Sequence, residues 1–413
     1  MALKIAIDPD RVERLILELG RFGAHSGTGV WRTVYSPEWL AAADQFAQWC
    51  LDAGMAVHRD AVGNVWGRIE GAEAGPAIVS GSHIDTQTPG GRYDGALGAI
   101  AALIAIDALH RQFGRPRRSL EVVAFCEEEG SRFSAANFWA SRGATGFIDP
   151  AELDSLVDSE GISIGQAMVG IGLDPASIGT ARRNDIEAFI ELHIEQGPVL
   201  EAADLAVGVV TAITGMRHYR VELTGVSNHA GAFPMDARKD PMAGFAEIAT
   251  GLVSTAERWG RPAVTTIGQV FVEPNMPSVI PDTVRFMIDV RHPDAQAGKR
   301  LYQLHENMMR EIADRRGLGI AITVVEDQPA LDCDPAIMAS IRSAATAAEI
   351  PIGSLPSGGS HDSQQMAKIA RAAMIFVRSK DGRSHTPEEF SSVDDCVAGI
   401  EVLAWTLHAL AYA

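Results

Sequence analysis

Residues 213–330 carry a pattern of strands and helices that is complete in itself. Alternating apolar residues predict strands, and apolar residues at helical spacing predict helices. The strands are expected at residues 217–224, 265–271, 283–290 and 320–325, and the helices at 241–259 and 297–315. The order strand, helix, strand, strand, helix, strand is typical of the ferredoxin-like split βαβ module. We therefore expect a small α+β domain with its own core.

The chain on either side of this stretch alternates strands with helices. Strands are predicted at residues 56–69, 77–80, 119–125 and 373–377, and helices at 36–54, 95–109, 337–347 and 393–411. Such alternation predicts a mixed sheet with helices on both faces. We expect one α/β domain made of residues 1–212 and 331–413, with the domain of residues 213–330 inserted into it.

Length and charge narrow the functional classes. The chain has 413 residues, which favours two domains, and 35 basic against 53 acidic residues give a formal net charge of −18. Nucleic-acid binding needs clustered positive charge, so no such partner is expected. The acidity is compatible with a cation site built from carboxylates, although an acidic soluble surface explains most of it.

The cysteines and the N-terminal segment favour a cytoplasmic protein. Cys50, Cys126, Cys333 and Cys396 form no CxxC pair, and Cys126 ends an apolar run that reads as a buried strand, so no disulfide framework is expected. Residues 1–8 lack the apolar region of a signal peptide. No uncharged apolar stretch reaches the roughly 18 residues that span a bilayer, so no membrane partner is expected.

A histidine and an aspartate follow the predicted strand at 77–80. His83 lies in Gly81-Ser82-His83-Ile84-Asp85-Thr86, and Asp94 lies in the glycine-rich segment 90–95. Both can face one cation, because glycine lets the backbone turn sharply beside it. Asp85 is placed to bond the other imidazole nitrogen of His83 and fix its tautomer. Taken alone, an HxD pair is equally compatible with a core histidine.

Three adjacent carboxylates, Glu127, Glu128 and Glu129, follow the next strand. Carboxylates at a strand end repel one another unless cations or protons compensate. One of them can ligate a metal while a neighbour remains free as a general base. The simpler alternative is a solvated loop.

Two more histidines complete a candidate ligand set. His193 lies on a strand-like segment between Leu192 and Ile194, and His385 lies in a turn near the end of the chain. The set contains nitrogen and oxygen donors without thiolate, which suits zinc, manganese, cobalt or nickel. Five ligands exceed one tetrahedral site, and two ions sharing a bridging carboxylate fit the number. The set is His83, Asp94, Glu129, His193 and His385.

These residues stand in motifs that resemble the M20 metallopeptidase superfamily. More narrowly, they resemble its hydantoinase/carbamoylase branch of N-carbamoyl-L-amino-acid hydrolases, allantoate amidohydrolases and β-ureidopropionases. The similarity extends over nearly the whole chain. The motifs are GSHxDT at residues 81–86, GGRxDGxLG at 90–98, EEGSRF at 128–133, HIEQGPxLE at 193–201, NHAG at 228–231, DxR at 289–291, SHD at 360–362 and SHTPEE at 384–389.

The resemblance implies a zinc-peptidase-like catalytic domain that holds two divalent ions. His83 and His193 would be terminal ligands of one ion, and Asp94 would be the bridge. Glu129 and His385 would hold the other ion. Glu128 would act as the general base, and Asp85 would orient His83.

The resemblance further implies that the inserted domain is a lid and forms a homodimer. His229 would stabilise the developing oxyanion, in the site of the partner subunit. Asn275 and Arg291 would grip the substrate carboxylate, a bidentate task that suits a guanidinium. Gln196, Gly358, Gly359 and His361 would line the ureido end of the pocket. The residues alone leave simpler alternatives: Asn275 can shape a turn, Arg291 can be a surface charge, and His361 can cap the helix that follows.

The expected function is hydrolysis of the carbamoyl C–N bond of an N-carbamoyl-L-amino acid or a similar small carboxylated ureido acid. Alternatives are allantoate, or a dipeptide or acyl-amino acid, as the substrate, and a non-catalytic binding protein that keeps the fold. The chain departs from the family pattern at residues 232–235, which read Ala-Phe-Pro-Met instead of Thr-Thr-Pro-Met. It also departs at residues 357–362, which read Ser-Gly-Gly-Ser-His-Asp instead of Ser-Gly-Ala-Gly-His-Asp. These departures leave the exact substrate open.

Overall fold

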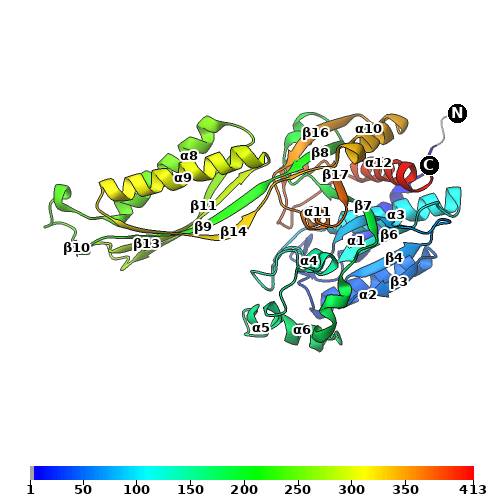
Figure 1. Cartoon of the computed structure of the whole chain (residues 1–413), viewed down its shortest axis with the longest axis horizontal. Coiled ribbons are helices and arrows are strands. Elements are labelled where there is room, and N and C mark those ends of the chain that lie inside the picture. Colours follow the sequence, from blue (N-terminus) through cyan, green and yellow to red (C-terminus); the bar gives the residue numbers. More distant parts are fainter. Residues whose placement is uncertain (1–3) are drawn as a thin grey trace. The chain divides into compact units, whose positions relative to one another are not determined.

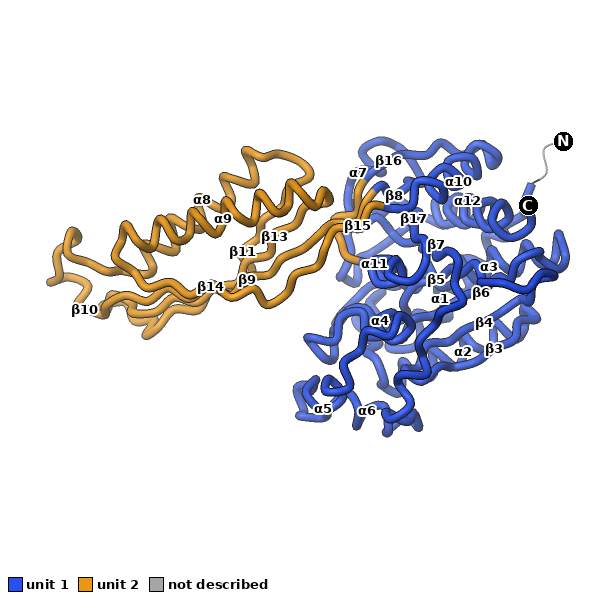
Figure 2. The backbone as a smooth tube through the Cα atoms, viewed as in Figure 1, with its two compact units in different colours: residues 1–211, 333–355, 361–413 blue, residues 212–332, 356–360 orange. Residues whose placement is uncertain are grey.

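The computed structural model describes residues 4–413. Residues 1–3, the start of the segment considered above for a signal peptide, lie outside the described part. The chain divides into two compact units, which Figure 2 colours separately. Unit 1 contains residues 1–211, 333–355 and 361–413, and unit 2 contains residues 212–332 and 356–360. That unit 2 acts as a lid and dimerisation domain remains a prediction.

Within residues 4–413, a nine-stranded mixed sheet forms the centre of unit 1. Its middle is four parallel strands in the order β17 (Arg371–Val377), β7 (Ile186–Ile194), β5 (Ala77–His83) and β6 (Leu120–Phe125). Antiparallel strands continue it on both sides (Figure 1). They are β4 (Val65–Ile69) and β3 (Ala56–Arg59) beyond β6, and β8 (Val207–Ile213) beyond β17, with β16 (Ile352–Ser357) and β15 (Leu331–Asp332) paired to β8.

Helices pack on both faces of this sheet. On one face, α3 (Ala96–Phe113) packs against α12 (Val393–Ala411) and against β5, β6 and β7. The position of a Cβ on Gly98 would lie 2.6 Å from the Cβ of Ser82, so only glycine allows α3 to approach β5 this closely. The helices α1 (Pro9–Leu19), α2 (Pro37–Asp52) and α10 (Pro335–Ala347) complete this layer. On the other face, α11 (Asp362–Met366) packs on β7 and β17 and against α4 (Trp139–Thr145). The predicted α/β fold with helices on both faces of a mixed sheet is confirmed.

The helix α3 has the length and composition of a membrane span. It is the one such helix among the described residues, with a mean hydropathy of 1.3, but 72% of it is buried inside the protein. Core helices of soluble proteins share this composition, so the feature is weak evidence for a membrane.

The strand predicted at residues 56–69 is a hairpin of two strands, β3 and β4. The turn between them is stabilised by Asp60, whose carboxylate accepts the backbone N–H groups of Val62 and Asn64. Aspartate competes with strand pairing in this way at turns. Apolar periodicity alone did not reveal the turn.

Unit 2 is built on a separate four-stranded antiparallel sheet. Its strand order is β11 (Val264–Glu273), β13 (Thr283–His292), β9 (Gly215–Thr224) and β14 (Gly319–Gln328). The helices α8 (Pro241–Trp259) and α9 (Ala295–Arg315) pack on one face (Figure 1). The core between them includes Tyr219, Val221, Leu223, Phe286, Ile288 and Leu301. This is the strand order of a split βαβ module, as the sequence predicts.

Shorter elements connect these parts. They are β1 (Ala24–His25), β2 (Gly29–Val30), α5 (Glu152–Ser155), α6 (Ile164–Gly170), η1 (Pro175–Ala181), α7 (Val199–Ala202), β10 (Asn228–His229), η2 (Met235–Ala237), β12 (Val279–Ile280) and η3 (Lys380–Gly382). All four cysteines are buried and free.

Candidate metal centre

The candidate site lies at the carboxyl ends of the four parallel strands in unit 1. His83 is the last residue of β5, His193 is the last but one of β7, and Glu127 follows β6 by two positions. His385 lies in the loop after β17. Because these strands are neighbours and run the same way, their carboxyl ends meet at one edge, where ligands bind in open α/β sheets.

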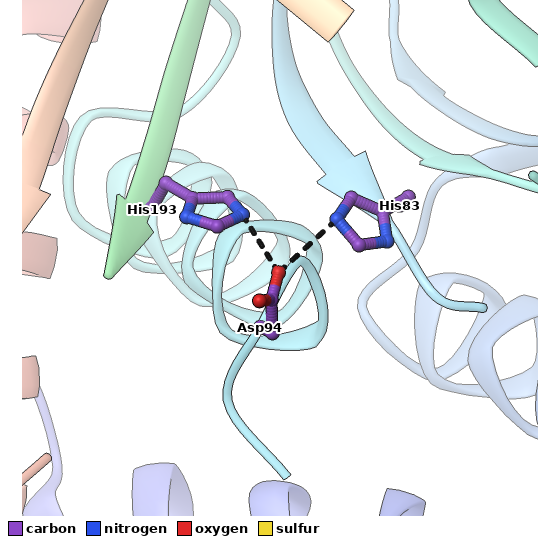
Figure 3. A group of neighbouring side chains, drawn as sticks. All are labelled: His83, Asp94 and His193. Atoms are coloured by element: carbon purple, nitrogen blue, oxygen red, sulfur yellow. Dashed lines mark ion pairs between the residues drawn. The ribbon is translucent and has the colours of Figure 1, made fainter. Parts of the chain in front are cut away.

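Asp94 lies between two imidazoles. Its Oδ1 is 3.1 Å from Nε2 of His193 and 3.4 Å from Nε2 of His83. Figure 3 shows both rings pointing at this carboxylate from the ends of two different strands. All three side chains are almost fully buried, and their ligand atoms lie within 4.8 Å of one another.

The other oxygen of Asp94 faces a second group of side chains. Oδ2 of Asp94 is 3.3 Å from Nε2 of His385, and that nitrogen is 3.5 Å from Oε2 of Glu129. The structure therefore brings all five candidate ligands to one place, with Asp94 between two clusters. Glu128 is also at this place, with Oε2 4.0 Å from Nε2 of His83.

Hydrogen bonds fix which nitrogen of each buried histidine faces the centre. Nδ1 of His193 is 2.9 Å from the carbonyl oxygen of Ile194, so Nδ1 carries the proton. Nε2 of His193 accepts the N–H of Gly95 at 3.2 Å and therefore holds the lone pair. For His83, Nδ1 is 3.2 Å from Oδ1 of Asp85, which leaves Nε2 toward Asp94. The geometry thus agrees with the orienting role expected of Asp85.

Gly95 allows the close approach of Asp94 to His83. Gly95 has φ +61, in the left-handed region, and a Cβ built on it would lie 2.4 Å from three atoms of the His83 ring. Any other residue would displace that ring or the start of α3. The sequence motif contains this glycine, but its steric reason is visible only in the structure.

Glu127 is fully buried and the side chains of Glu128 and Glu129 are largely buried, so the alternative of a solvated loop is wrong. Burial is the largest cause that raises the pKa of Glu127 and of Glu128 well above the usual value, and it raises the pKa of Glu129 to about 7. By contrast, the pKa of Asp94 is lowered: burial opposes this, but His193, His385 and His83 outweigh it.

The donors fit a divalent cation. Oε1 of Glu129 is buried and has no hydrogen-bond partner in the described structure, while Gln87 donates to Oε2 at 2.8 Å. A buried carboxylate oxygen without a donor is costly unless a cation or a proton compensates it. Together with imidazole nitrogens that hold lone pairs, this supports a metal site with nitrogen and oxygen ligands.

Two of the expected pocket residues lie against this centre. Gln196 donates from Nε2 to Oδ2 of Asp94 at 2.7 Å. The ring of His361 lies 4.5 Å from the ring of His193, centroid to centroid. His361 also stands at the N-cap of α11, so its capping role and its place beside the centre are compatible. Burial lowers the pKa of His361 well below the usual value, which leaves the ring neutral.

The other expected substrate residues lie in unit 2. His229 is exposed, and its Nδ1 accepts the N–H groups of Gly231 and Ala232 at 3.0 and 3.1 Å. Asn275 is exposed and has φ +55, which is the backbone of a turn residue.

Arg291 is held in place rather than being a free surface charge. It makes an ion pair with Asp289 at 2.8 Å, and Nη1 donates to the carbonyl oxygen of Gly358 at 3.2 Å. Gly359, in the same segment as Gly358, accepts from Ser357 through its carbonyl oxygen. Burial tends to raise the pKa of Asp289, but His218 and Arg291 lower it to about 2.

Sequence reasoning missed two residues that contact the centre. Ser384 donates to Oδ2 of Asp94 at 2.6 Å, and Glu389 accepts the backbone N–H of Asp94 at 2.9 Å. Both belong to the SHTPEE motif, and that motif was the available signal. It gave no indication of which loop they contact.

Known proteins resemble this chain over almost its full length. The model of peptidase family M20/M25/M40 matches residues 79–409. An allantoate amidohydrolase of Escherichia coli (strain K12) is 40% identical, covering 97% of this chain and 98% of that protein. An N-carbamoyl-L-amino-acid amidohydrolase of Paenarthrobacter aurescens is 37% identical, covering 97% of this chain and 98% of that protein.

Solved structures agree with these relatives. The crystal structure of an amidase of the hydantoinase/carbamoylase family from Burkholderia multivorans has a TM-score of 0.89 and 33% identity, and the match covers 99% of both chains. Fold and sequence similarity therefore extend together over both units. The chain belongs to the M20/M25/M40 peptidase family and, within it, to the hydantoinase/carbamoylase group of amidases.

Proposed function

We propose that this protein is a metal-dependent hydrolase of C–N bonds in linear amides, and that it cleaves the carbamoyl group of an N-carbamoyl-L-amino acid or a similar ureido acid. The observation that carries the proposal is the convergence of five nitrogen and oxygen ligands beside Glu128. The relatives at 37–40% identity are named for amidohydrolysis of such substrates.

Two divalent ions would share Asp94. His83 and His193 would bind one of them, and Glu129 and His385 would bind the other, because these pairs lie at opposite oxygens of that carboxylate. When bound, such ions polarise a carbonyl oxygen and acidify a water molecule. The donor set suits zinc, manganese, cobalt or nickel.

Glu128 would move the proton in this reaction. It would take a proton from the attacking water and deliver it to the departing nitrogen, which needs a carboxylate in reach of both. Its place supports this role, because Glu128 is largely buried and its Oε2 lies 4.0 Å from Nε2 of His83. Asp85 would keep it there by accepting its backbone N–H at 3.1 Å.

Unit 2 would supply the rest of the site. His229 would stabilise the oxyanion, and Asn275 and Arg291 would bind the substrate carboxylate. Arg291 would do so with the N–H groups that Asp289 does not occupy. Gly358 and Gly359 would line the ureido end together with Gln196 and His361.

The protein would act as a cytoplasmic homodimer joined through unit 2. Four buried free cysteines support a reducing compartment. A dimer is supported by the exposure of His229, which lies outside unit 1 and would serve the site of the partner subunit. Light scattering together with activity tests this, since a strictly monomeric protein with full turnover contradicts it.

Other substrates define the alternatives. Allantoate is the first, because the relative at 40% identity is named for it. Dipeptides and acyl-amino acids are the second. A non-catalytic binding protein is disfavoured, because it predicts the loss of a ligand or of the base, and all five ligands and Glu128 are in place.

A substrate panel on metal-loaded protein tests the proposal. The apoprotein is loaded separately with manganese, zinc, cobalt and nickel, and release of ammonia or amine is followed for N-carbamoyl-L-amino acids, allantoate and dipeptides. We expect turnover of ureido acids and none of dipeptides. Dipeptide turnover alone would refute the ureido assignment, and absence of any bound metal under all loadings would refute the catalytic one.

A further inference from the structure

Glu389 joins the loop that carries Asp94 to the loop that carries His385. Its Oε1 accepts the backbone N–H groups of Tyr93 at 2.8 Å and of Asp94 at 2.9 Å. Its Oε2 lies 2.9 Å from the hydroxyl oxygen of Ser384, within hydrogen-bond distance. Only 4% of Glu389 is exposed, so water does not replace these contacts.

The Glu389 carboxylate is also tightly packed against the backbone of Gly91. A Cβ on Gly91 would lie 2.2 Å from Oε1 of Glu389, so the carboxylate occupies the space that a side chain at residue 91 would need. The Ser384 hydroxyl also lies 2.6 Å from Oδ2 of Asp94, the oxygen that faces His385. Glu389 thus contacts the backbone of Asp94 and, through Ser384, its side chain.

We propose that Glu389 is a positioning residue, which fixes Asp94 and the His385 loop relative to each other through hydrogen bonds to the Tyr93 and Asp94 N–H groups and to Ser384. The physical reason is that Asp94 must present one oxygen to each pair of ligands. Rotation of its peptide unit would misdirect both oxygens. Two buried N–H groups without an acceptor would also be costly and would favour such a rotation.

This inference rests on the proposed metal centre and goes beyond it. Glu389 contacts Asp94 through the backbone N–H of Asp94, and it is not one of the candidate metal ligands or substrate-binding residues. Outer hydrogen-bond partners of metal ligands typically affect metal affinity or activity by about 10- to 100-fold. The effect of replacing such a residue on metal affinity or activity is therefore measurable, although the residue does not contact the reacting atoms.

Three variants separate positioning from general stabilisation. Glu389→Ala removes the acceptor, whereas Glu389→Gln keeps an amide oxygen for the two N–H groups and an N–H for Ser384. The neighbouring Glu388 is exposed and accepts from the hydroxyl of Thr386 instead of from the Asp94 loop, so Glu388→Ala is the matched control. The measurements are the metal dissociation constant of the apoprotein by competition with a chromogenic chelator, the rise in Tm on adding Mn²⁺, and kcat and KM for a ureido substrate.

We expect Glu389→Ala to bind metal about 10- to 100-fold more weakly, to show a smaller metal-induced rise in Tm, and to lose kcat more than KM. Glu389→Gln should lie within about threefold of the wild type, and Glu388→Ala should match it. Wild-type metal affinity in folded Glu389→Ala overturns the inference, as does an equal loss in the Gln variant or in Glu388→Ala. If Glu389→Ala does not fold, Glu389→Asp, whose shorter side chain does not reach both loops, takes its place. A wild-type protein that binds no metal would instead refute the proposed function.

Discussion

The carboxylate of Asp85 accepts the backbone N–H of Glu128 at 3.1 Å, while its Oδ1 also lies 3.2 Å from Nδ1 of His83. Oδ2 of Asp85 accepts the N–H of Glu129 at 3.2 Å. One fully buried carboxylate therefore holds a candidate ligand imidazole and the backbone of both the candidate base and another ligand. The expected role of Asp85 covered only the histidine.

Asp85→Asn should therefore disturb the backbone at Glu128 and Glu129 as well as the imidazole of His83. An amide presents one acceptor oxygen, and its NH2 group faces a backbone N–H or an imidazole N–H, so at least one donor is left unsatisfied. We expect metal affinity and kcat to fall by about 10- to 100-fold with a well-folded protein. Metal titration of the apoprotein checks this. Unchanged affinity and kcat would show that Asp85 does not position the site.

Glu128→Gln should separate proton transfer from metal binding. The amide keeps the size of the side chain but does not accept a proton, and general acid–base catalysis contributes about 10²- to 10⁴-fold. We expect kcat to fall by about that factor, with metal content unchanged by elemental analysis. Glu388→Gln, at an exposed glutamate, is the control and should retain full activity. Near-normal turnover of Glu128→Gln is incompatible with its role as the base.

Gly95→Ala should damage the metal centre by steric conflict. Its methyl group would lie 2.4 Å from the His83 ring, in a backbone conformation with φ +61. Gly114→Ala is a matched control, because Gly114 has φ +73 and nothing within 4 Å of its Cβ position. Both substitutions cost about 1 to 3 kcal/mol in backbone strain, but only Gly95→Ala should lose metal, as measured by stoichiometry per chain. Equal metal loss in both variants would mean that backbone strain, and not contact with the His83 ring, causes the loss.

Removing the metal should destabilise unit 1. Without cations, the buried carboxylates after β6 and Asp94 face one another uncompensated, and a ligand that binds only the folded state adds about 4 kcal/mol at a thousandfold excess over its Kd. We expect a chelator to lower Tm and abolish activity, and added Mn²⁺ or Zn²⁺ to restore both. A chelated protein with unchanged Tm and activity would argue against a resident metal.

His218 should make unit 2 less stable in alkaline solution. It lies 3.2 Å from Asp289 and 3.1 Å from Glu326, and these bonds raise its pKa to about 9. A raised folded-state pKa stabilises the protein fully below the unfolded value of about 6.5, and this contribution is lost as pH rises through about 9. Arg291 also faces Asp289, so the pair is not isolated.

Urea unfolding at several pH values between 6 and 10 tests this linkage. The wild type should lose about 1 to 3 kcal/mol over that range, since one pKa unit corresponds to about 1.4 kcal/mol. His218→Gln should remove that part of the pH dependence and lower stability at pH 6. If the free energy of unfolding of His218→Gln changes with pH as it does in the wild type, other groups cause the pH dependence.

The site was largely predictable because each candidate ligand lies at the carboxyl end of a strand or in the loop that follows it. His83, the glutamates after β6 and the loop after β17 could be placed at one edge once parallel strands were predicted. The inserted module was predictable for a similar reason, since α8 and the alternating strand β13 carry strong periodic patterns. The hairpin at β3 and β4 was missed because the aspartate turn interrupts a run that is apolar on both sides.

The sequence by itself determined the elements, the ligand types and their order, because periodicity and local motifs act over a few residues. Only the tertiary structure decided which backbone groups support them. Glu389 and Asp94 are 295 positions apart, and the side chain of Gln196 donates to Asp94 from the loop after β7. Contacts between distant segments depend on how strands pair and loops pack, and a pattern read along one chain carries no information on that geometry.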